Sequence, residues 1–186
     1  MTISYTLWGK VDTTQDAWES FAEDALKICE TLGFKATHYS ISVFSSFDSR
    51  LGKIGGIKRR LANIRRKTEE VIDNATIVSL PEDFRTVIFD FVITLSRTSA
   101  RFDDDEDYIT LIINKHYTGD IDVDEEQIIH ILGKHIAANR GEIYEMSISG
   151  DPEGYAADPE GKLVNYGRVK SIKKFRFDKE GNRCDL

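Results

Sequence analysis

The strongest structural signal in the chain is a stripe of apolar residues, spaced three and four apart, that runs from Trp18 to Leu32. This spacing is typical of a helix that buries one face. Thr13 or Thr14 before it has a side chain suited to capping a helix, and Gly33 after it is a residue at which helices end. The sequence therefore predicts an amphipathic helix near the N-terminus, packed on a core.

Residues 3–9 and 35–44, on either side of this helix, alternate polar and apolar side chains as strands do. Further strands are predicted at residues 75–80, 84–97, 108–117 and 143–149. Helices are predicted at about 57–72 and from Asp122 or Asp124 to about Gly141. This order of elements predicts the α+β class: a mixed or antiparallel sheet of ferredoxin-like elements with helices packed on one face.

The sequence changes character after Gly150. Asp151-Pro152-Glu153-Gly154 recurs as Asp158-Pro159-Glu160-Gly161, and residues 178–182 resemble a third turn of the same kind. Proline at the second position and glycine at the fourth are typical of type I turns. Residues 163–170 and 172–177 are predicted strands between these turns. We therefore expect a core domain over residues 1–150 and a C-terminal β-hairpin extension over 151–186, packed on the same domain.

The composition limits the classes of function. A chain of 186 residues fits one domain, and no apolar run approaches the ~20 residues that span a bilayer. The N-terminus lacks the features of a secretory signal, and two distant cysteines indicate no disulfide framework. We expect a cytoplasmic protein with no cofactor and no membrane contact. The net charge of −7 argues against direct binding of nucleic acids.

Charges are segregated along the chain. A basic segment from Arg50 to Lys67 contains no acidic residue, whereas Asp103–Asp107 is an acidic run and residues 120–126 are a second acidic cluster. The basic segment is interpreted as a solvated helix face rather than a phosphate clamp, because no aromatic residue after Phe47 interrupts it. The acidic segments predict an exposed surface that attracts a basic partner.

Histidine offers the one pattern that indicates catalysis. His38 and Ser40, and likewise His116 and Thr118, stand two residues apart, so each pair shares one side of a strand. This pattern resembles the two motifs of 2H phosphoesterases, and the resemblance implies acid–base catalysis on a phosphodiester. The preferred interpretation is two histidines on solvent-facing strand positions.

Two further histidines, His130 and His135, are five residues apart on one predicted helix. This spacing places them off the i,i+4 face that metal ligands on a helix would share. We therefore expect no metal site at these histidines.

Tyr5-Thr6-Leu7-Trp8-Gly9, followed by Glu19, Ser20 and Ala22, resembles the opening of bacterial immunity proteins of polymorphic toxin systems. The resemblance implies a non-catalytic inhibitor that neutralises a cognate toxin, for example a nuclease, by tight binding. Two alternatives stay open, a 2H-like phosphoesterase and a structural or assembly protein, and so does the oligomeric state. The expected partner-binding residues are Asp103, Asp104, Asp105, Glu106, Asp107, Asp120 and Asp122.

Overall fold

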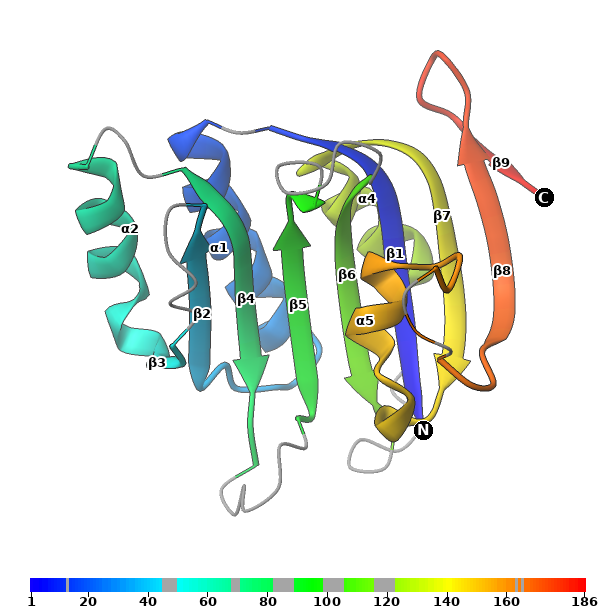
Figure 1. The fold of residues 1–186 in the computed structure, drawn as a ribbon, viewed down its shortest axis with the longest axis horizontal. Coiled ribbons are helices and arrows are strands. Elements are labelled where there is room, and N and C mark those ends of the chain that lie inside the picture. The colour runs from blue at the N-terminus through cyan, green and yellow to red at the C-terminus, as the bar shows by residue number, and fades with distance from the viewer. Residues whose placement is uncertain are drawn as a thin grey trace.

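The computed structural model describes residues 1–12, 14–44, 50–67, 71–81, 89–98, 106–115, 123–162, 164 and 166–186. Within them, nine strands form one sheet in the order β3-β2-β4-β5-β6-β1-β7-β8-β9 (Figure 1). The strands are β1 (Thr2–Val11), β2 (His38–Val43), β3 (Gly52–Lys53), β4 (Ile72–Ser79), β5 (Phe91–Ser96), β6 (Asp107–Asn114), β7 (Ile136–Met146), β8 (Lys170–Phe177) and β9 (Arg183–Asp185). The helices are α1 (Gln15–Thr31), α2 (Ile57–Arg65), α4 (Glu125–Gly133) and α5 (Pro152–Ala157), with short 3-10 turns η1 (Ile54–Gly56) and η3 (Ile148–Gly150).

Every strand pair in this sheet is antiparallel, which confirms the α+β class and the antiparallel form of the predicted sheet. β6, β5 and β4 lie between β1 and β2, whereas only β1 lies between β6 and β7. Because β6 and β7 both run antiparallel to β1, they are parallel to each other, and α4 lies in the connection between them.

Helix α1 is the element that the sequence predicted most fully. The hydroxyl of Thr14 accepts a hydrogen bond from the amide of Ala17 at 3.3 Å and caps the first turn. Gly33 has a φ of 79°, and the amide of Phe34 donates to the carbonyl of Cys29 at 2.8 Å. This closing turn needs the left-handed conformation that glycine adopts without strain. The apolar stripe of α1 packs in the main core of the protein.

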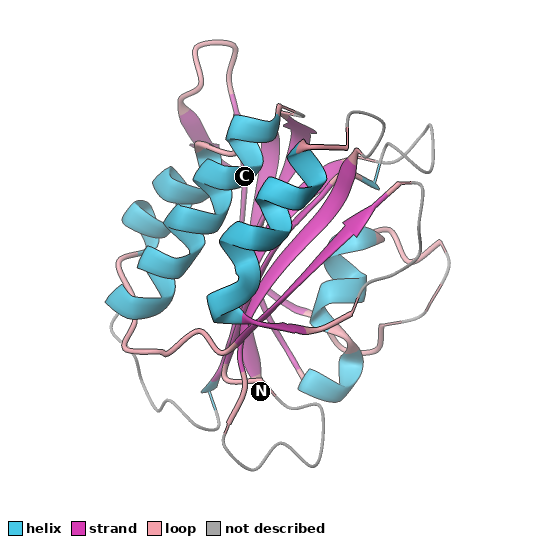
Figure 2. Ribbon diagram, turned by 90° about the vertical axis from the view of Figure 1, so that its left-hand side faces the viewer, coloured by secondary structure: helices cyan, strands magenta, loops and turns pink. Residues whose placement is uncertain are grey.

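The two faces of the sheet are covered differently. α1, α2 and α4 pack on one face, here called the first face, and α5 packs on the opposite, second face (Figure 2). The prediction that helices pack on one face is therefore wrong for α5. Residues 151–154 were interpreted as a turn, but Asp151 caps a short helix: its carboxylate accepts from the amide of Gly154 at 3.0 Å, and Pro152 fills the first turn.

Covering both faces changes which residues of the central strands are buried. The alternation in β5 and β6 predicted one buried side, yet every residue of both strands is buried. On the second face, Trp8 and Tyr108 pack with Ala156 of α5, and the indole Nε1 of Trp8 donates to the carbonyl of Ala156 at 2.8 Å. The first residues of the strand predicted from 84 to 97 belong to the segment 82–88, which lies outside the described residues.

Two predicted helices extended too far. α2 ends at Arg65, and Ile72 already belongs to β4. α4 ends at Gly133, and β7 begins at Ile136, where helix had been predicted to about Gly141. The apolar spacing alone could not show that residues 136–141 pair with β1. As a consequence, His130 and His135 do not share a helix.

The C-terminal residues continue the same sheet. β8 pairs with β7 and with β9, and the turn between β8 and β9 is closed by Asp178, whose carboxylate accepts from the amides of Glu180 and Asn182. Residues 166–169, predicted to be strand, are not in a strand. None of the helices in the described part of the chain combines the length and the apolar character that crossing a bilayer requires.

Candidate protein-interaction surface

Of the expected partner-binding residues, the structure describes two, Glu106 and Asp107, since Asp103, Asp104, Asp105, Asp120 and Asp122 lie outside the described residues. Glu106 accepts a hydrogen bond from Arg140 Nε at 2.8 Å and another from Asn139 Nδ2 at 2.8 Å. Asp107 is 2% exposed, and its Oδ2 accepts from the amide of Val11 at 3.0 Å. Both residues were expected to face a partner, but they fasten β6 to β1 and β7 instead.

The internal bonds of Glu106 affect its ionisation. Burial by itself would raise its pKa, but hydrogen bonds from Arg140 and Asn139 outweigh burial and hold the pKa below the ordinary value. Glu125 of α4 behaves in the same way: burial raises its pKa, and the hydrogen bonds from Arg183 and Lys173 lower it further than burial raises it. The described acidic groups at these positions are therefore charged and already paired with cations of the same chain.

The predicted catalytic pairs are described only in part. His38 and Ser40 lie on β2, opposite Val78 and Thr76 of β4, and the ring Nδ1 of His38 is 3.0 Å from the hydroxyl of Thr37. His116 and Thr118 lie outside the described residues, so the structure does not describe the two pairs together.

Ser40 begins a row of hydroxyl residues that crosses the second face in register. Thr76, Thr94, Thr110 and Thr6 follow it on successive strands. Thr76 and Thr94 are joined by a 3.0 Å hydrogen bond, and Thr94 donates to Glu153 of α5 at 2.8 Å. These hydroxyl groups attach α5 to the sheet.

Tyr144 extends the same network and is completely buried. Its hydroxyl donates to the carbonyl of Pro152 at 2.9 Å, and burial raises its pKa to about 12. Alternation alone did not predict these contacts, because it indicated one buried side for each strand, and Thr94 and Thr110 lie on the other side. The hydroxyl groups of this network therefore bond to one another and to α5: those of Thr6, Thr76, Thr94, Thr110 and Tyr144 each take part in at least one hydrogen bond.

His135 is packed in the core beside Asp24 and Phe21. It is 8% exposed, its Nε2 is 3.1 Å from Asp24 Oδ2, and its ring packs edge-on against Phe21 at 5.7 Å between centroids. Among the residues that the structure describes, no group of three or more His, Cys, Asp or Glu side chains is placed to hold a metal ion.

The predicted basic segment forms the clearest exposed surface. In α2, Ile57, Leu61 and Ile64 are buried against the first face, which turns the basic residues outward. Lys58 lies 3.9 Å from Glu23, and Arg65 lies 3.3 Å from Asp16, both on α1. Four other cations make no ion pair with any residue of the described ranges: Lys53, Arg59, Arg60 and Arg66.

Two exposed apolar side chains lie where β2 ends and β4 begins, at the opposite end of β2 from Lys53. Phe44, at the end of β2, is 57% exposed, and Val71, just before β4, is 43% exposed. The amide of Phe44 donates to the carbonyl of Val71 at 2.8 Å, so the two residues are neighbours. We use the name α2 surface for the four cations together with the two exposed apolar residues. It is defined by Phe44, Lys53, Arg59, Arg60, Arg66 and Val71.

A groove of about 290 Å³ adjoins the α2 surface between α1 and α2. Leu26, Ala22 and Ala62 supply apolar lining, while Glu19 and Glu23 of α1 form its acidic wall. The basic α2 surface is therefore bordered by carboxylates on the α1 side.

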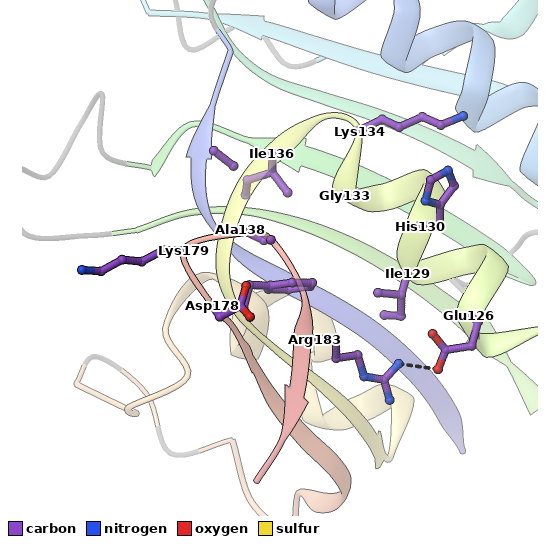
Figure 3. Close-up of a pocket in the computed structure, with 13 residues that line it drawn as sticks. Glu126, Ile129, His130, Gly133, Lys134, Ile136, Ala138, Asp178, Lys179 and Arg183 are labelled. Atoms are coloured by element: carbon purple, nitrogen blue, oxygen red, sulfur yellow. Dashed lines mark hydrogen bonds and ion pairs between the residues drawn. The ribbon is translucent and has the colours of Figure 1, made fainter.

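A second concave region lies at the opposite end of the sheet. A cleft of about 590 Å³ separates the end of α4 and the first residues of β7 from the β8–β9 hairpin (Figure 3). Ile129, Ile136, Ala138 and Phe177 supply its apolar lining. Arg183 of β9 reaches across to Glu126 of α4 at 2.9 Å and ties the hairpin to the helix.

Sequence reasoning had marked the basic segment but had given it no role, and it had missed the C-terminal cleft. The cleft depends on the distance between α4 and the β8–β9 hairpin, and no local pattern in the amino-acid sequence indicates that distance. Comparison of the chain with family models, with curated proteins and with solved structures gave no match.

Proposed function

We propose that this protein is a non-catalytic inhibitor of the immunity type, which binds an acidic surface of a partner protein through the α2 surface. The observation that carries the proposal is the set of cations on the outward side of α2 that make no ion pair with any described residue, on a molecule of net charge −7. Arginine and aromatic residues are enriched at the centres of protein interfaces, where they supply most of the binding free energy.

The geometry of α2 favours one extended contact. Arg59 and Arg66 are seven residues apart, so they lie on the same outward stripe of the helix, about 10 Å apart along its axis. Guanidinium groups bind carboxylates in a bidentate manner and lose less hydration than ammonium groups do. Phe44 and Val71 add exposed apolar area at the end of β2 and just before β4.

The partner is proposed to be acidic, in place of the basic partner expected from the sequence. Glu106 and Asp107, the described members of the expected acidic surface, are engaged inside the molecule. The cations of the α2 surface, by contrast, make no ion pair with any residue that the structure describes.

A protein fits this surface better than a nucleic acid does. Asp16, Glu19 and Glu23 of α1 border the α2 surface and would repel a continuous phosphate backbone. A protein can place carboxylates over α2 and other groups over α1. The inhibitory form of the proposal is supported by the resemblance of residues 5–9 and 19–22 to immunity proteins.

The test begins with wild-type protein and the Arg59→Glu/Arg66→Glu variant as baits in a lysate of the organism that encodes the chain. A protein retained by the wild type and lost with the variant is then purified, and its association is measured at 50 and 300 mM salt. We expect the variant to reduce the association rate about tenfold or more at the lower salt, and less at the higher salt, because screening shortens the range of attraction.

The Lys27→Glu/Lys35→Glu variant is the matched control. It changes the charge equally, at exposed lysines outside the α2 surface, and should leave association within about twofold of the wild-type rate. An inhibitor must also suppress the activity or toxicity of the purified partner. Equal loss of binding in both variants, or a bound partner whose activity is unchanged, would contradict the proposal.

A further inference from the structure

The sheet contains a gap at its C-terminal end. β7 has 11 residues and pairs with β1 along its whole length, but β8 pairs only with Arg140–Glu145. Among the residues that the structure describes, residues 136–139 therefore have a neighbouring strand on one side only. The cleft of about 590 Å³ lies beside these residues and is closed on its far side by the β8–β9 hairpin.

We infer that this cleft binds an extended segment of a partner protein, which adds a strand next to the first residues of β7. Strand addition at an open sheet edge is a common mode of peptide recognition, with affinity from main-chain hydrogen bonds and specificity from alternate side chains. The site lies at the far end of the sheet from β3 and α2, so it is independent of the α2 surface (Figure 1).

The main-chain groups that would bind such a segment can be identified. The carbonyl of Ala137 faces β1. It lies so close to Gly9 that a Cβ atom at position 9 would overlap it. Because neighbouring residues of a strand direct their main-chain groups to opposite sides, the N–H and C=O of Ala138 point toward the cleft. Within the described ranges, neither group has a hydrogen-bond partner on that side.

The lining determines which side chains the segment should carry. Ile129, Ile136 and Phe177 form an apolar floor on the first face, so the residues that point toward α4 should be apolar. The two carboxylates of the lining are occupied, Glu126 by Arg183 and Asp178 by its own turn.

The cations of the rim are open, in contrast to its carboxylates. Lys134 and Lys179 make no ion pair within the described part of the chain, and Figure 3 shows both side chains extending outward from the rim. The partner segment should therefore alternate apolar residues with acidic ones.

The cleft is open before any segment binds, because Arg183 fixes the hairpin. Its guanidinium is bonded to Glu125, Glu126 and Asp185 and stacks on Phe175 at 4.4 Å. A second copy of this chain is a poorer occupant. The open edge of β8 carries Lys170, Lys173 and Lys174 and a bulge at Ile172, which are features that block pairing between edges.

Nuclear magnetic resonance of the ¹⁵N-labelled full chain tests the inference in two steps. Without peptide, the amide of Ala138 should exchange with solvent about tenfold or more faster than that of Ile143, which lies between two paired strands. A nine-residue peptide of alternating valine and glutamate, capped at both ends, is then added, alongside the same peptide with lysine in place of glutamate.

The glutamate peptide should shift the amides of Ala137, Ala138 and Gly181 and slow the exchange of Ala138. The lysine peptide should bind about fivefold more weakly or less well still, because of the rim charges. The Lys179→Glu substitution should weaken binding of the glutamate peptide to a similar degree. The Lys35→Glu substitution, at an exposed lysine away from the cleft, should leave that binding unchanged. Both variants must show the wild-type spectrum elsewhere, which establishes that they fold.

Several results would overturn the inference. Slow exchange of Ala138 in the free chain would show that no open edge exists. Absence of shifts with either peptide, equal binding of both, or shifts confined to β8 would exclude a strand-addition site in the cleft. Concentration-dependent dimerisation that protects Ala138 would assign the cleft to a second copy of the chain.

Discussion

Arg183 in β9 donates a 2.8 Å hydrogen bond to the carboxylate of Glu125 in α4, and this contact joins the last strand of the sheet to a helix of the first face. The guanidinium is only 13% exposed and also contacts Glu126 and Asp185. Most cations on the two edges of this protein are exposed. Arg183 is instead a structural residue, and the shape of the C-terminal cleft depends on it.

Arg183→Ala should therefore lower the free energy of unfolding by about 1–3 kcal/mol, because it removes the packing of a mostly buried side chain on Phe175 and leaves Glu125 with Lys173 as its one remaining cation among the described residues. Arg176→Ala is the control. Arg176 is exposed on β8, its side chain makes no hydrogen bond or ion pair within the described residues, and its replacement should change stability by less than about 0.5 kcal/mol. Urea denaturation of both variants measures the difference, and equal effects would contradict the assignment.

Gly9 is the site of a close approach between β1 and β7. A Cβ added there would overlap the carbonyl of Ala137 and would lie 2.8 Å from the Cα of Ala138. Since both obstacles belong to the main chain, Gly9→Ala should destabilise the protein by about 2 kcal/mol or more. Gly55→Ala, where an added Cβ meets no atom within 4 Å, should have little effect. Thermal unfolding of the two variants distinguishes a steric cost from a general cost of replacing glycine.

Glu153 predicts a pH dependence of stability. Burial raises its pKa above the ordinary value of 4.5, the hydrogen bond from Thr94 opposes this, and the charge of Asp151 adds to it. The folded state therefore binds the proton more tightly than the unfolded state, and stability is lost as the pH rises through the folded-state pKa. Glu153→Gln keeps an acceptor for Thr94 without the charge.

At pH 7 the Glu153→Gln variant should be more stable than the wild type by about 1 kcal/mol. The gain should disappear below pH 4.5, where both states of the wild type are protonated. Glu160→Gln, at an exposed residue paired with Lys162 at 3.2 Å, should show no such dependence. Denaturation curves between pH 4 and 8 provide the measurement, and a gain that is independent of pH would refute the role of the buried charge.

His135 should titrate below 6.5. Burial lowers its pKa, whereas the hydrogen bond and the charge of Asp24 partly restore it. Asp24→Asn should therefore lower this pKa further, and the imidazole resonances of His135 report it directly. Because the unfolded state takes up the proton first, this residue should reduce stability as the pH falls from about 6.5. A rise of the pKa in Asp24→Asn would contradict this account.

Helix α1 shows how much local sequence can determine. Thr14, the apolar stripe and Gly33 each indicate the same element, and the helix has the predicted cap and the predicted closing turn. The strand before it was predicted to end at Gly9, but β1 continues to Val11. Glycine at position 9 allows β7 to lie unusually close to β1. The sequence of one strand does not indicate how close its neighbouring strand lies.

Residues 136–141 and 151–154 show where local patterns were misleading. Helical spacing continued past Gly133, yet pairing with β1 determines that residues 136–141 are strand. The Asp-Pro-Glu-Gly sequence is suited to a turn or to the first turn of a helix, and packing on Trp8 selects the helix. The expected acidic surface was misassigned at Asp107 for a similar reason, because charge alone does not show which carboxylate receives a buried amide.

By itself, the sequence determined the α+β class, helix α1, most strand positions and the basic segment, because these depend on periodicity and capping within short stretches of chain. The tertiary structure decided that α5 covers the second face, that Asp107 is buried and Glu106 is bonded to Arg140, and that a cleft lies beside the first residues of β7. These features depend on contacts between residues far apart in the chain. The periodicity and capping residues of a short stretch of sequence do not indicate which of these contacts form or how much they stabilise the fold.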